Sequence, residues 1–155
     1  MVKEGQKAPA FKLQNDEGEW VSLEDYAGRH LVLYFYPKDD TPGCTTEACS
    51  FRDQFAEFKT RGIEIAGVSA DSPDSHKKFK EKFHLNFPLL SDPDKKMMKE
   101  YGVWKEKSMY GKKFMGIERT TLMIDEDGKI VKVFPKVKVS DHVEDILESF
   151  STLKR

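Results

Sequence analysis

An apolar run followed by a turn and an amphipathic segment constrains the fold more than any other feature of the chain. Leu31 to Tyr36 is a continuous apolar and aromatic run, which is typical of a strand buried on both faces. A turn rich in proline and glycine follows, and Thr45 to Lys59 then predicts a helix with apolar side chains every three or four residues. Ile63 to Ser69 predicts a second strand. A strand, a helix and a strand in this order form a crossover between parallel strands, so we predict an α/β fold.

The rest of the chain alternates predicted strands and helices in the same way. A short hairpin is predicted about Asn15 to Gly18, and strands at Arg119 to Ile124 and Ile130 to Phe134 are joined by a turn. The other predicted helices are Pro73 to Phe83, Pro93 to Tyr101, and a C-terminal helix that Ser140 caps and whose apolar stripe contains Val143, Ile146, Leu147 and Phe150. No linker, repeat or low-complexity tract interrupts residues 1–155, so a single domain is expected. Periodicity alone leaves several α/β topologies open.

The chain has two cysteines, Cys44 at the start of the predicted helix and Cys49 five residues later. A thiol is a strong nucleophile only as a thiolate, and the N-terminus of a helix stabilises negative charge. In an intact helix the two cysteines are rotated by about 140° and their Cα atoms lie roughly 8.7 Å apart, beyond the ~7 Å limit for a disulfide. A bond between them therefore requires local unwinding. Two unrelated helix cysteines or a fixed structural disulfide are the alternatives, although a fixed bridge would disrupt the helix.

The residues around Cys44 resemble a known family. Pro37 to Cys44 matches the pattern Pro-x-x-x-Thr-x-x-Cys of the peroxiredoxins, and Tyr36 to Asp53 is similar to the bacterioferritin comigratory protein, or peroxiredoxin Q, subfamily. The resemblance continues at Gly5 to Phe11, Gly67 to Asp71, Tyr101 to Trp104 and Arg119 to Thr121. It implies a thioredoxin-like fold, with a central mixed sheet flanked by helices and an N-terminal β-hairpin.

The same resemblance implies roles for individual residues. Cys44 would be the peroxidatic cysteine and Cys49 the resolving one, with Thr41 and Arg119 as their catalytic support. Some members carry the resolving cysteine on the next helix, but residues 72–83 contain none, so Cys49 is the only candidate within the chain.

Peroxide reduction requires more than an ionised cysteine. A thiol of pKa ~8.5 is about 3% thiolate at pH 7, so complete ionisation raises the rate about thirtyfold at most. The larger share must come from alignment and from preorganised hydrogen-bond donors. The backbone N–H groups of Gly43 and Cys44, the Thr41 hydroxyl and the Arg119 guanidinium are candidate donors, and Pro37 would help to fix the loop. We therefore expect Pro37 and Gly43 to line the substrate site.

Arg119 opens a strand-like run, where a charge without a partner is costly to bury. A thiolate would serve as that partner. The alternative is an arginine at an exposed strand end, paired with Glu118 or Glu47. Glu47 lies one turn into the Cys44 helix, where it could orient Arg119 at the substrate site or only favour the helix dipole.

Composition excludes several classes of function. A net charge of −1, with acidic residues among the lysine clusters, argues against a nucleic-acid surface. The polar N-terminus predicts no secretory signal, and no apolar run approaches the ~20 residues that span a bilayer. We expect a cytoplasmic protein, in which a cysteine pair is catalytic or redox-sensing.

The histidines (His30, His76, His84 and His142) lack the spacing of metal ligands, so neither a metal nor a cofactor is expected.

These observations predict a thiol-dependent peroxidase that reduces hydrogen peroxide and organic hydroperoxides. Cys44 would become a sulfenic acid, Cys49 would condense with it, and a dithiol reductant would reopen the disulfide. The resemblance suggests thioredoxin for this role, and the residues themselves leave glutaredoxin or another donor open. The resemblance also favours a monomer. A general thiol–disulfide oxidoreductase is one alternative, but the chain lacks Cys-x-x-Cys and has Thr120 where a thioredoxin has its active-site proline. A redox-sensing interaction protein is the other alternative.

The segment before Arg119 contains several large apolar side chains, which we expect to pack in the core and loops or to form a mobile lid: Trp104, Tyr110, Phe114 and Met115.

Overall fold

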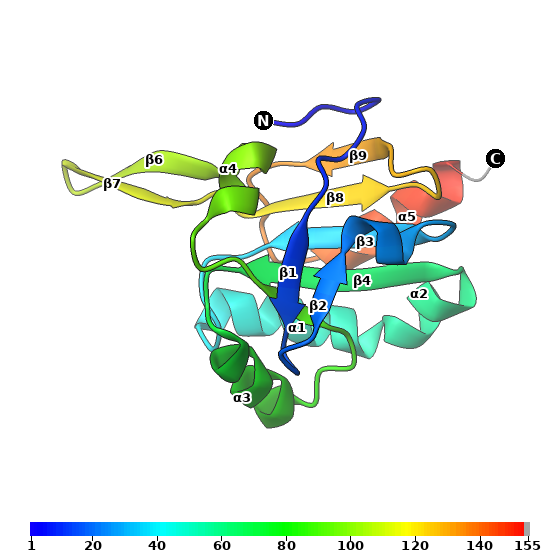
Figure 1. Cartoon of the computed structure of the whole chain (residues 1–155), viewed down its shortest axis with the longest axis horizontal. Helices are drawn as coiled ribbons and strands as arrows, with labels where there is room; N and C mark the ends of the chain where they lie inside the picture. Colours follow the sequence, from blue (N-terminus) through cyan, green and yellow to red (C-terminus); the bar gives the residue numbers. More distant parts are fainter. Residues whose placement is uncertain (154–155) are drawn as a thin grey trace.

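The computed structural model describes residues 1–153 and consists of a seven-stranded sheet, a separate two-stranded hairpin and helices on both sides of the sheet (Figure 1). The elements are β1 (Lys12–Asn15), β2 (Trp20–Ser22), the 3₁₀ helix η1 (Leu23–Tyr26), β3 (His30–Phe35), α1 (Pro42–Asp53), α2 (Phe55–Thr60), β4 (Ile63–Ser69), α3 (Pro73–Phe83), β5 (Leu89–Ser91), α4 (Lys96–Tyr101), β6 (Trp104–Met109), β7 (Lys112–Ile117), β8 (Thr120–Ile124), β9 (Ile130–Phe134) and α5 (His142–Leu153).

The large sheet is mixed, in the order β2-β1-β5-β4-β3-β8-β9. β3 pairs parallel with β4 and antiparallel with β8, and β4 pairs parallel with β5. β1 and β2 form the predicted N-terminal hairpin, whose turn is closed by the Asn15 side chain accepting from the N–H groups of Glu17 and Glu19. The predicted α/β fold, with a mixed sheet, flanking helices and an N-terminal hairpin, is therefore confirmed.

The central strand β3 is buried on both faces, as its continuous apolar run predicts. Alternate side chains of β3 and the residue after it face α1 and α5, whereas the others face the N-terminal segment and α4. The first set is Val32, Tyr34 and Tyr36, and the second is Leu31, Leu33 and Phe35. The sheet thus has a core on each side, and the C-terminal end of β3 is held rigidly where the chain turns toward α1.

The predicted helix Thr45 to Lys59 is wrong in its limits. The structure has two helices there, because Gln54 leaves the helical conformation with φ −99° and ψ 5°. The first of them, α1, begins earlier than predicted, at Pro42, which follows Thr41 in an extended conformation. Proline is favoured at the first helical position because its missing N–H would have no partner there. Cys44 is consequently inside the first turn of α1.

Other element boundaries also differ from the predictions. α5 begins at His142, two residues after Ser140, which was expected to cap it. α4 is shorter than the predicted Pro93 to Tyr101, because it begins at Lys96 after an N-cap residue in the left-handed region. The short strand β5 was not predicted.

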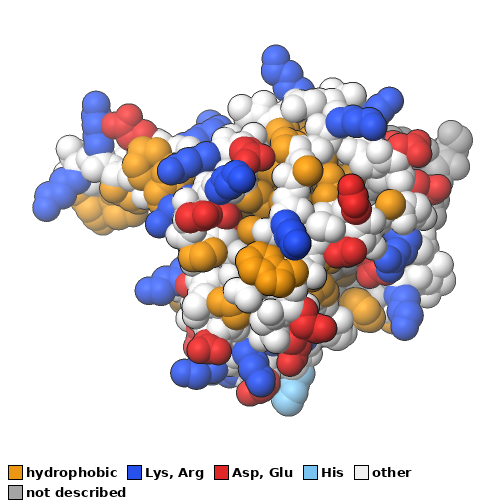
Figure 2. Space-filling model, in the orientation of Figure 1, with side chains coloured by type: hydrophobic (Ala, Val, Ile, Leu, Met, Phe, Trp, Pro, Cys, Tyr) orange, Lys and Arg blue, Asp and Glu red, His pale blue; other side chains and the backbone are white. Residues whose placement is uncertain are grey.

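The segment between α4 and β8 forms a projecting arm, β6 and β7, instead of the expected loop (Figure 1). Its apolar side chains Met109, Tyr110, Phe114 and Met115 are exposed, and lysines lie among them (Figure 2). The prediction that Tyr110, Phe114 and Met115 pack in the core is therefore wrong, whereas Trp104 packs partly against the core at the base of the arm. No helix of the described residues has the length and apolar character needed to span a membrane.

Candidate active site

The Cys44 side chain is buried in the first turn of α1, which follows the loop that leaves β3. Backbone N–H groups at the start of a helix have no partners within the helix, and they carry the positive end of its dipole. The Thr41 side chain makes no capping hydrogen bond to them. The sulfur therefore lies at the end of the helix that stabilises an anion.

Arg119 contacts Cys44 from the opposite side of the site. It lies between β7 and β8, and its Nη2 donates to Cys44 Sγ at 3.3 Å. Its Nη1 donates to Glu47 Oε1 at 2.7 Å. Two of the three partners considered for this arginine, the sulfur and Glu47, are thus bound at once, while Glu118 pairs with Lys105. Only 17% of the Arg119 side chain is exposed, so the guanidinium is not a surface charge.

Burial and charge act against each other in this pair. Burial raises the pKa of Glu47 to about 7, although the nearby Arg119 guanidinium lowers it. Burial also opposes the charge on Arg119, but Glu47 and the Cys44 sulfur outweigh it and raise the pKa of the guanidinium. Among the described residues, Glu47 Oε2 and the hydroxyl of the neighbouring Tyr34 have no hydrogen-bond partner. Burial, followed by the charge of Glu47, raises the pKa of Tyr34 well above its usual value.

The loop before α1 supplies the remaining polar group. The Thr41 hydroxyl donates to the carbonyl oxygen of Lys38 at 2.8 Å, so its oxygen has lone pairs free to accept a hydrogen. Pro37, at the start of the loop, is exposed. Gly43 lies beside Arg119, because a Cβ atom there would be 3.3 Å from Nη2. A side chain at this position would press on the guanidinium that contacts the sulfur.

Cys49 lies on the same helix, is partly exposed and is not bonded to Cys44. The far end of α1 is tied to the end of α3 and to the loop after it: Arg52 Nη1 donates to the Phe83 carbonyl at 2.7 Å, and Asn86 Nδ2 donates to the Arg52 carbonyl at 3.3 Å. Both hydrogen bonds therefore anchor α1 at Arg52, beyond Cys49, and not in the part of the helix between Cys44 and Cys49.

Residues 4–133 match the model of the AhpC/TSA family. This chain belongs to the AhpC/TSA family. It is 51% identical over 152 residues to peroxiredoxin Bcp of Bacillus subtilis, covering 98% of this chain and 97% of the relative. It is 46% identical over 146 residues to peroxiredoxin Bcp of Escherichia coli K12, covering 94% of each. Within the AhpC/TSA family it is thus a peroxiredoxin of the Bcp, or peroxiredoxin Q, group, and so a thiol-dependent peroxidase.

Solved structures agree with this assignment. A cysteine mutant of Xylella fastidiosa PrxQ superposes with a TM-score of 0.91 at 35% identity, over 99% of this chain and 100% of that one. Peroxiredoxin Q of Xanthomonas campestris superposes with a TM-score of 0.88 at 43% identity, over 92% and 90% of the two chains. The thioredoxin-like fold expected from the resemblance is confirmed.

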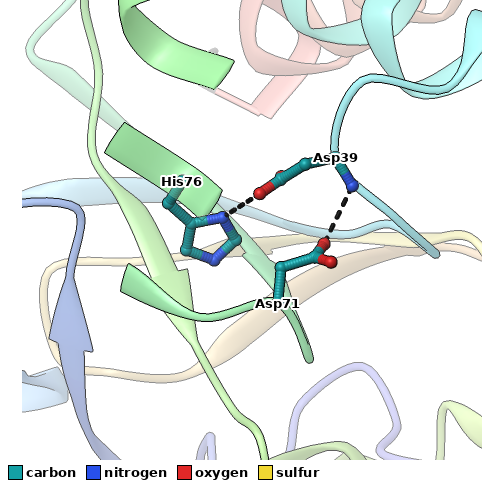
Figure 3. Close-up of side chains that lie close together, drawn as sticks. All are labelled: Asp39, Asp71 and His76. Atoms are coloured by element: carbon teal, nitrogen blue, oxygen red, sulfur yellow. Dashed lines mark hydrogen bonds and ion pairs between the residues drawn. The ribbon is translucent and has the colours of Figure 1, made fainter. Parts of the chain in front are cut away.

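A polar cluster that the sequence analysis missed lies beside the active site of this peroxiredoxin. Asp39, Asp71 and His76 lie close together, and all three offer ligand atoms within 4.8 Å of one another (Figure 3). The ligand atoms nevertheless already have hydrogen-bond partners within the protein, so the cluster gives no support for a metal ion. A signal was present: Asp39 and Asp71 follow β3 and β4, which are parallel neighbours, so both residues lie at the same edge of the sheet.

Proposed function

We propose that this peroxiredoxin reduces hydrogen peroxide and organic hydroperoxides with Cys44 as the peroxidatic cysteine and Cys49 as the resolving cysteine. The observation that carries the proposal is the Cys44 sulfur, buried at a helix N-terminus and 3.3 Å from the Arg119 guanidinium. Both features favour a thiolate. The bacterioferritin comigratory protein of Xanthomonas campestris, 41% identical, is described with an alkyl peroxide reduction activity, which supports organic hydroperoxides as substrates.

In the first step the Cys44 thiolate attacks one peroxide oxygen and the O–O bond breaks. The sulfur is oxidised to a sulfenic acid, and the departing oxygen leaves as hydroxide or alkoxide and takes up a proton. In this proposal Arg119 Nη2, which lies 3.3 Å from the sulfur, donates to the oxygens as charge develops on them, and Thr41 Oγ1 accepts the hydrogen of the peroxide O–H group. Preorganised donors of this kind supply more of the rate than ionisation of the thiol.

In the second step the Cys49 thiol condenses with the Cys44 sulfenic acid. The new S–S bond forms as the S–O bond breaks, and water leaves. The intact α1 separates the two Cα atoms by roughly 8.7 Å, so the first turns of the helix must unwind. The disulfide and the unwinding are part of this proposal.

A dithiol reductant must then reduce the disulfide by thiol–disulfide exchange. We propose thioredoxin or a similar protein for this role, and a monomeric, cytoplasmic enzyme in which residues 1–155 form one domain. A thioredoxin reductant is consistent with a cytoplasmic enzyme, because the cytoplasm keeps dithiols reduced.

Separate substitution of the two cysteines tests the proposal. Cys44→Ser should abolish peroxide reduction in a single turnover, whereas Cys49→Ser should keep the first oxidation and lose thioredoxin-linked turnover. Equal loss of the first oxidation in both variants would contradict the assignment, and normal recycling of Cys49→Ser would point to a mechanism with one cysteine. Insulin reduction without peroxidase activity would instead indicate a general oxidoreductase, and slow turnover a redox sensor.

A further inference from the structure

A buried polar network lies behind the loop that carries Thr41. Its centre is the Asp39 carboxylate, of which only 4% is exposed. This carboxylate accepts hydrogen bonds from the Tyr36 hydroxyl at 2.5 Å and from the Ser75 hydroxyl at 2.8 Å, and it contacts His76 Nδ1 at 2.7 Å (Figure 3). Buried carboxylates are costly unless they are hydrogen-bonded in this way. None of these groups is needed to explain the contacts of Cys44.

His76 joins this network to the sheet. Its Nε2 faces the carbonyl oxygen of Leu90 at 2.9 Å, and the ring is fully buried. Both ring nitrogens therefore face oxygen atoms that accept hydrogen bonds. These two contacts of the His76 ring link the loop after β3 to α3 and to the end of β5.

The network controls one peptide unit of the loop. The N–H of Asp39 donates to Asp71 Oδ2 at 2.8 Å, and Asp71 is itself held by the Ser69 hydroxyl at 2.6 Å. The carbonyl of the same peptide unit belongs to Lys38, and it accepts the Thr41 hydroxyl at 2.8 Å. Because a peptide unit is planar, fixing its N–H also fixes the direction of its carbonyl. The carbonyl in turn determines where the Thr41 hydroxyl points.

We propose that Asp39, Asp71 and His76 are positioning residues that orient Thr41 toward the peroxide through the Lys38–Asp39 peptide. They do not contact the reacting atoms. The inference rests on the proposed function of Cys44 and Thr41, and it adds a set of residues through which alignment, rather than thiolate formation, is controlled.

Two rates distinguish alignment from a general structural role. kcat/KM for hydrogen peroxide requires both the thiolate and an aligned peroxide, whereas alkylation of Cys44 by iodoacetamide, followed by peptide mass spectrometry, requires the thiolate alone. Asp71→Ala should lower kcat/KM about 10- to 100-fold, the cost of misplacing an aligned group. Its alkylation rate should stay within about twofold of wild type, because thiolate character is unchanged. Asp71→Asn keeps an acceptor oxygen for the Asp39 N–H and should restore most of kcat/KM.

A matched control is Asp16→Ala. Asp16 is also a buried aspartate, but its carboxylate pairs with Lys80 and accepts from the Leu89 N–H, and among the described residues no hydrogen bond joins it to the loop. It should lower the melting temperature without changing either rate. If Asp71→Ala does not fold, Ser75→Ala removes one hydrogen bond to Asp39 and should still lower kcat/KM while leaving alkylation unchanged.

The outcomes separate the positioning role from the proposed function. A wild-type protein that does not reduce peroxide would remove the proposed function itself. An active wild type with unchanged kcat/KM in Asp71→Ala, or in Ser75→Ala where that variant carries the test, would overturn the positioning role alone. An equal fall of peroxide reduction and alkylation in these variants would also overturn it, because the network would then only support the fold.

Discussion

Replacing Glu47 by glutamine should stabilise the protein at alkaline pH. Glu47 is buried, its Oε2 has no hydrogen-bond partner among the described residues, and only Oε1 is bound by Arg119 at 2.7 Å. In this position only one of the two carboxylate oxygens accepts a hydrogen bond from the described residues. Glutamine has nearly the same shape and carries no charge, so it relieves the cost of burying the ionised form.

The magnitude follows from the pKa of Glu47, which rises from 4.5 to about 7 on folding. Between these values the unfolded chain has lost its proton and the folded protein still holds it. Stability is therefore highest below pH 4.5, falls as the pH rises toward 7, and is constant above. The shift corresponds to about 3 kcal/mol in all, and to about 2 to 3 kcal/mol between pH 5 and pH 8. The glutamine variant has no such loss.

Urea unfolding at pH 5 and pH 8 measures this difference. Both proteins should carry Cys44→Ser, which removes the other titrating group that contacts Arg119. The free energy of unfolding of Glu47→Gln, relative to its parent, should increase by about 2 to 3 kcal/mol from pH 5 to pH 8. Glu57→Gln is the control, since it removes only a surface ion pair with Arg61, worth about 0 to 1 kcal/mol. A relative stability that is equal at both pH values would refute the argument, because the ion pair with Arg119 would then fully offset burial.

Three other predictions concern the arginine, the helix and the core. Arg119→Lys keeps the charge but cannot bind Cys44 and Glu47 together, so kcat/KM for peroxide should fall about 10- to 1,000-fold, beyond any change in the titration of the thiol; a rate near wild type would make Arg119 structural. In the oxidised protein, amide exchange should accelerate from Thr41 to about Arg52, where the contacts to Phe83 and Asn86 hold the helix; unchanged protection of this segment in a protein with the Cys44–Cys49 bond would exclude unwinding. Phe51→Ala should lower the free energy of unfolding by about 3 to 5 kcal/mol in urea titrations, because Phe51 is fully buried against Tyr34 and Phe58; a loss under about 1 kcal/mol would mean that the core repacks.

The parts of the fold that could be predicted are those encoded by neighbouring residues. The apolar run that became β3 needs no distant partner to be recognised, and the apolar positions after it predict a helix there, although the prediction begins that helix three residues after Pro42. The arm β6–β7 shows the opposite case. Lys105, Glu106 and Lys107 have no alternation of apolar and polar residues, and these strands are held mainly by pairing with each other. The turn of the arm places Tyr110 and Gly111 at positive φ. An Asn-Gly pair in the sequence would have indicated such a hairpin turn, whereas Tyr-Gly does not.

In the active site, too, some features are encoded by neighbouring residues and others depend on contacts between residues far apart in sequence. One short motif contains Thr41, Gly43 and Cys44, so these three residues could be named as candidates from the sequence alone. Glu47 could be placed on the Cys44 helix, but the perturbation of its pKa depends on burial and on Arg119, which is 72 residues away in sequence. Asp39 binds Asp71 and His76, which are 32 and 37 positions away in sequence, so the pairing of β3 with β4, and not a local pattern, indicates this network.

The contacts of Arg119 bear on how a buried acid can lie next to Cys44, the thiol that the proposed function requires to ionise. One guanidinium serves two groups that both gain from its charge: Nη1 binds Glu47 and Nη2 binds the Cys44 sulfur. Because burial favours the neutral form of Glu47 up to about pH 7, the carboxyl group does not claim the full charge of the arginine under those conditions. The positive charge can then stabilise the thiolate. A glutamate that ionised at its usual pKa would compete more strongly for the charge of Arg119, so burial of Glu47 favours the contact between the guanidinium and the sulfur.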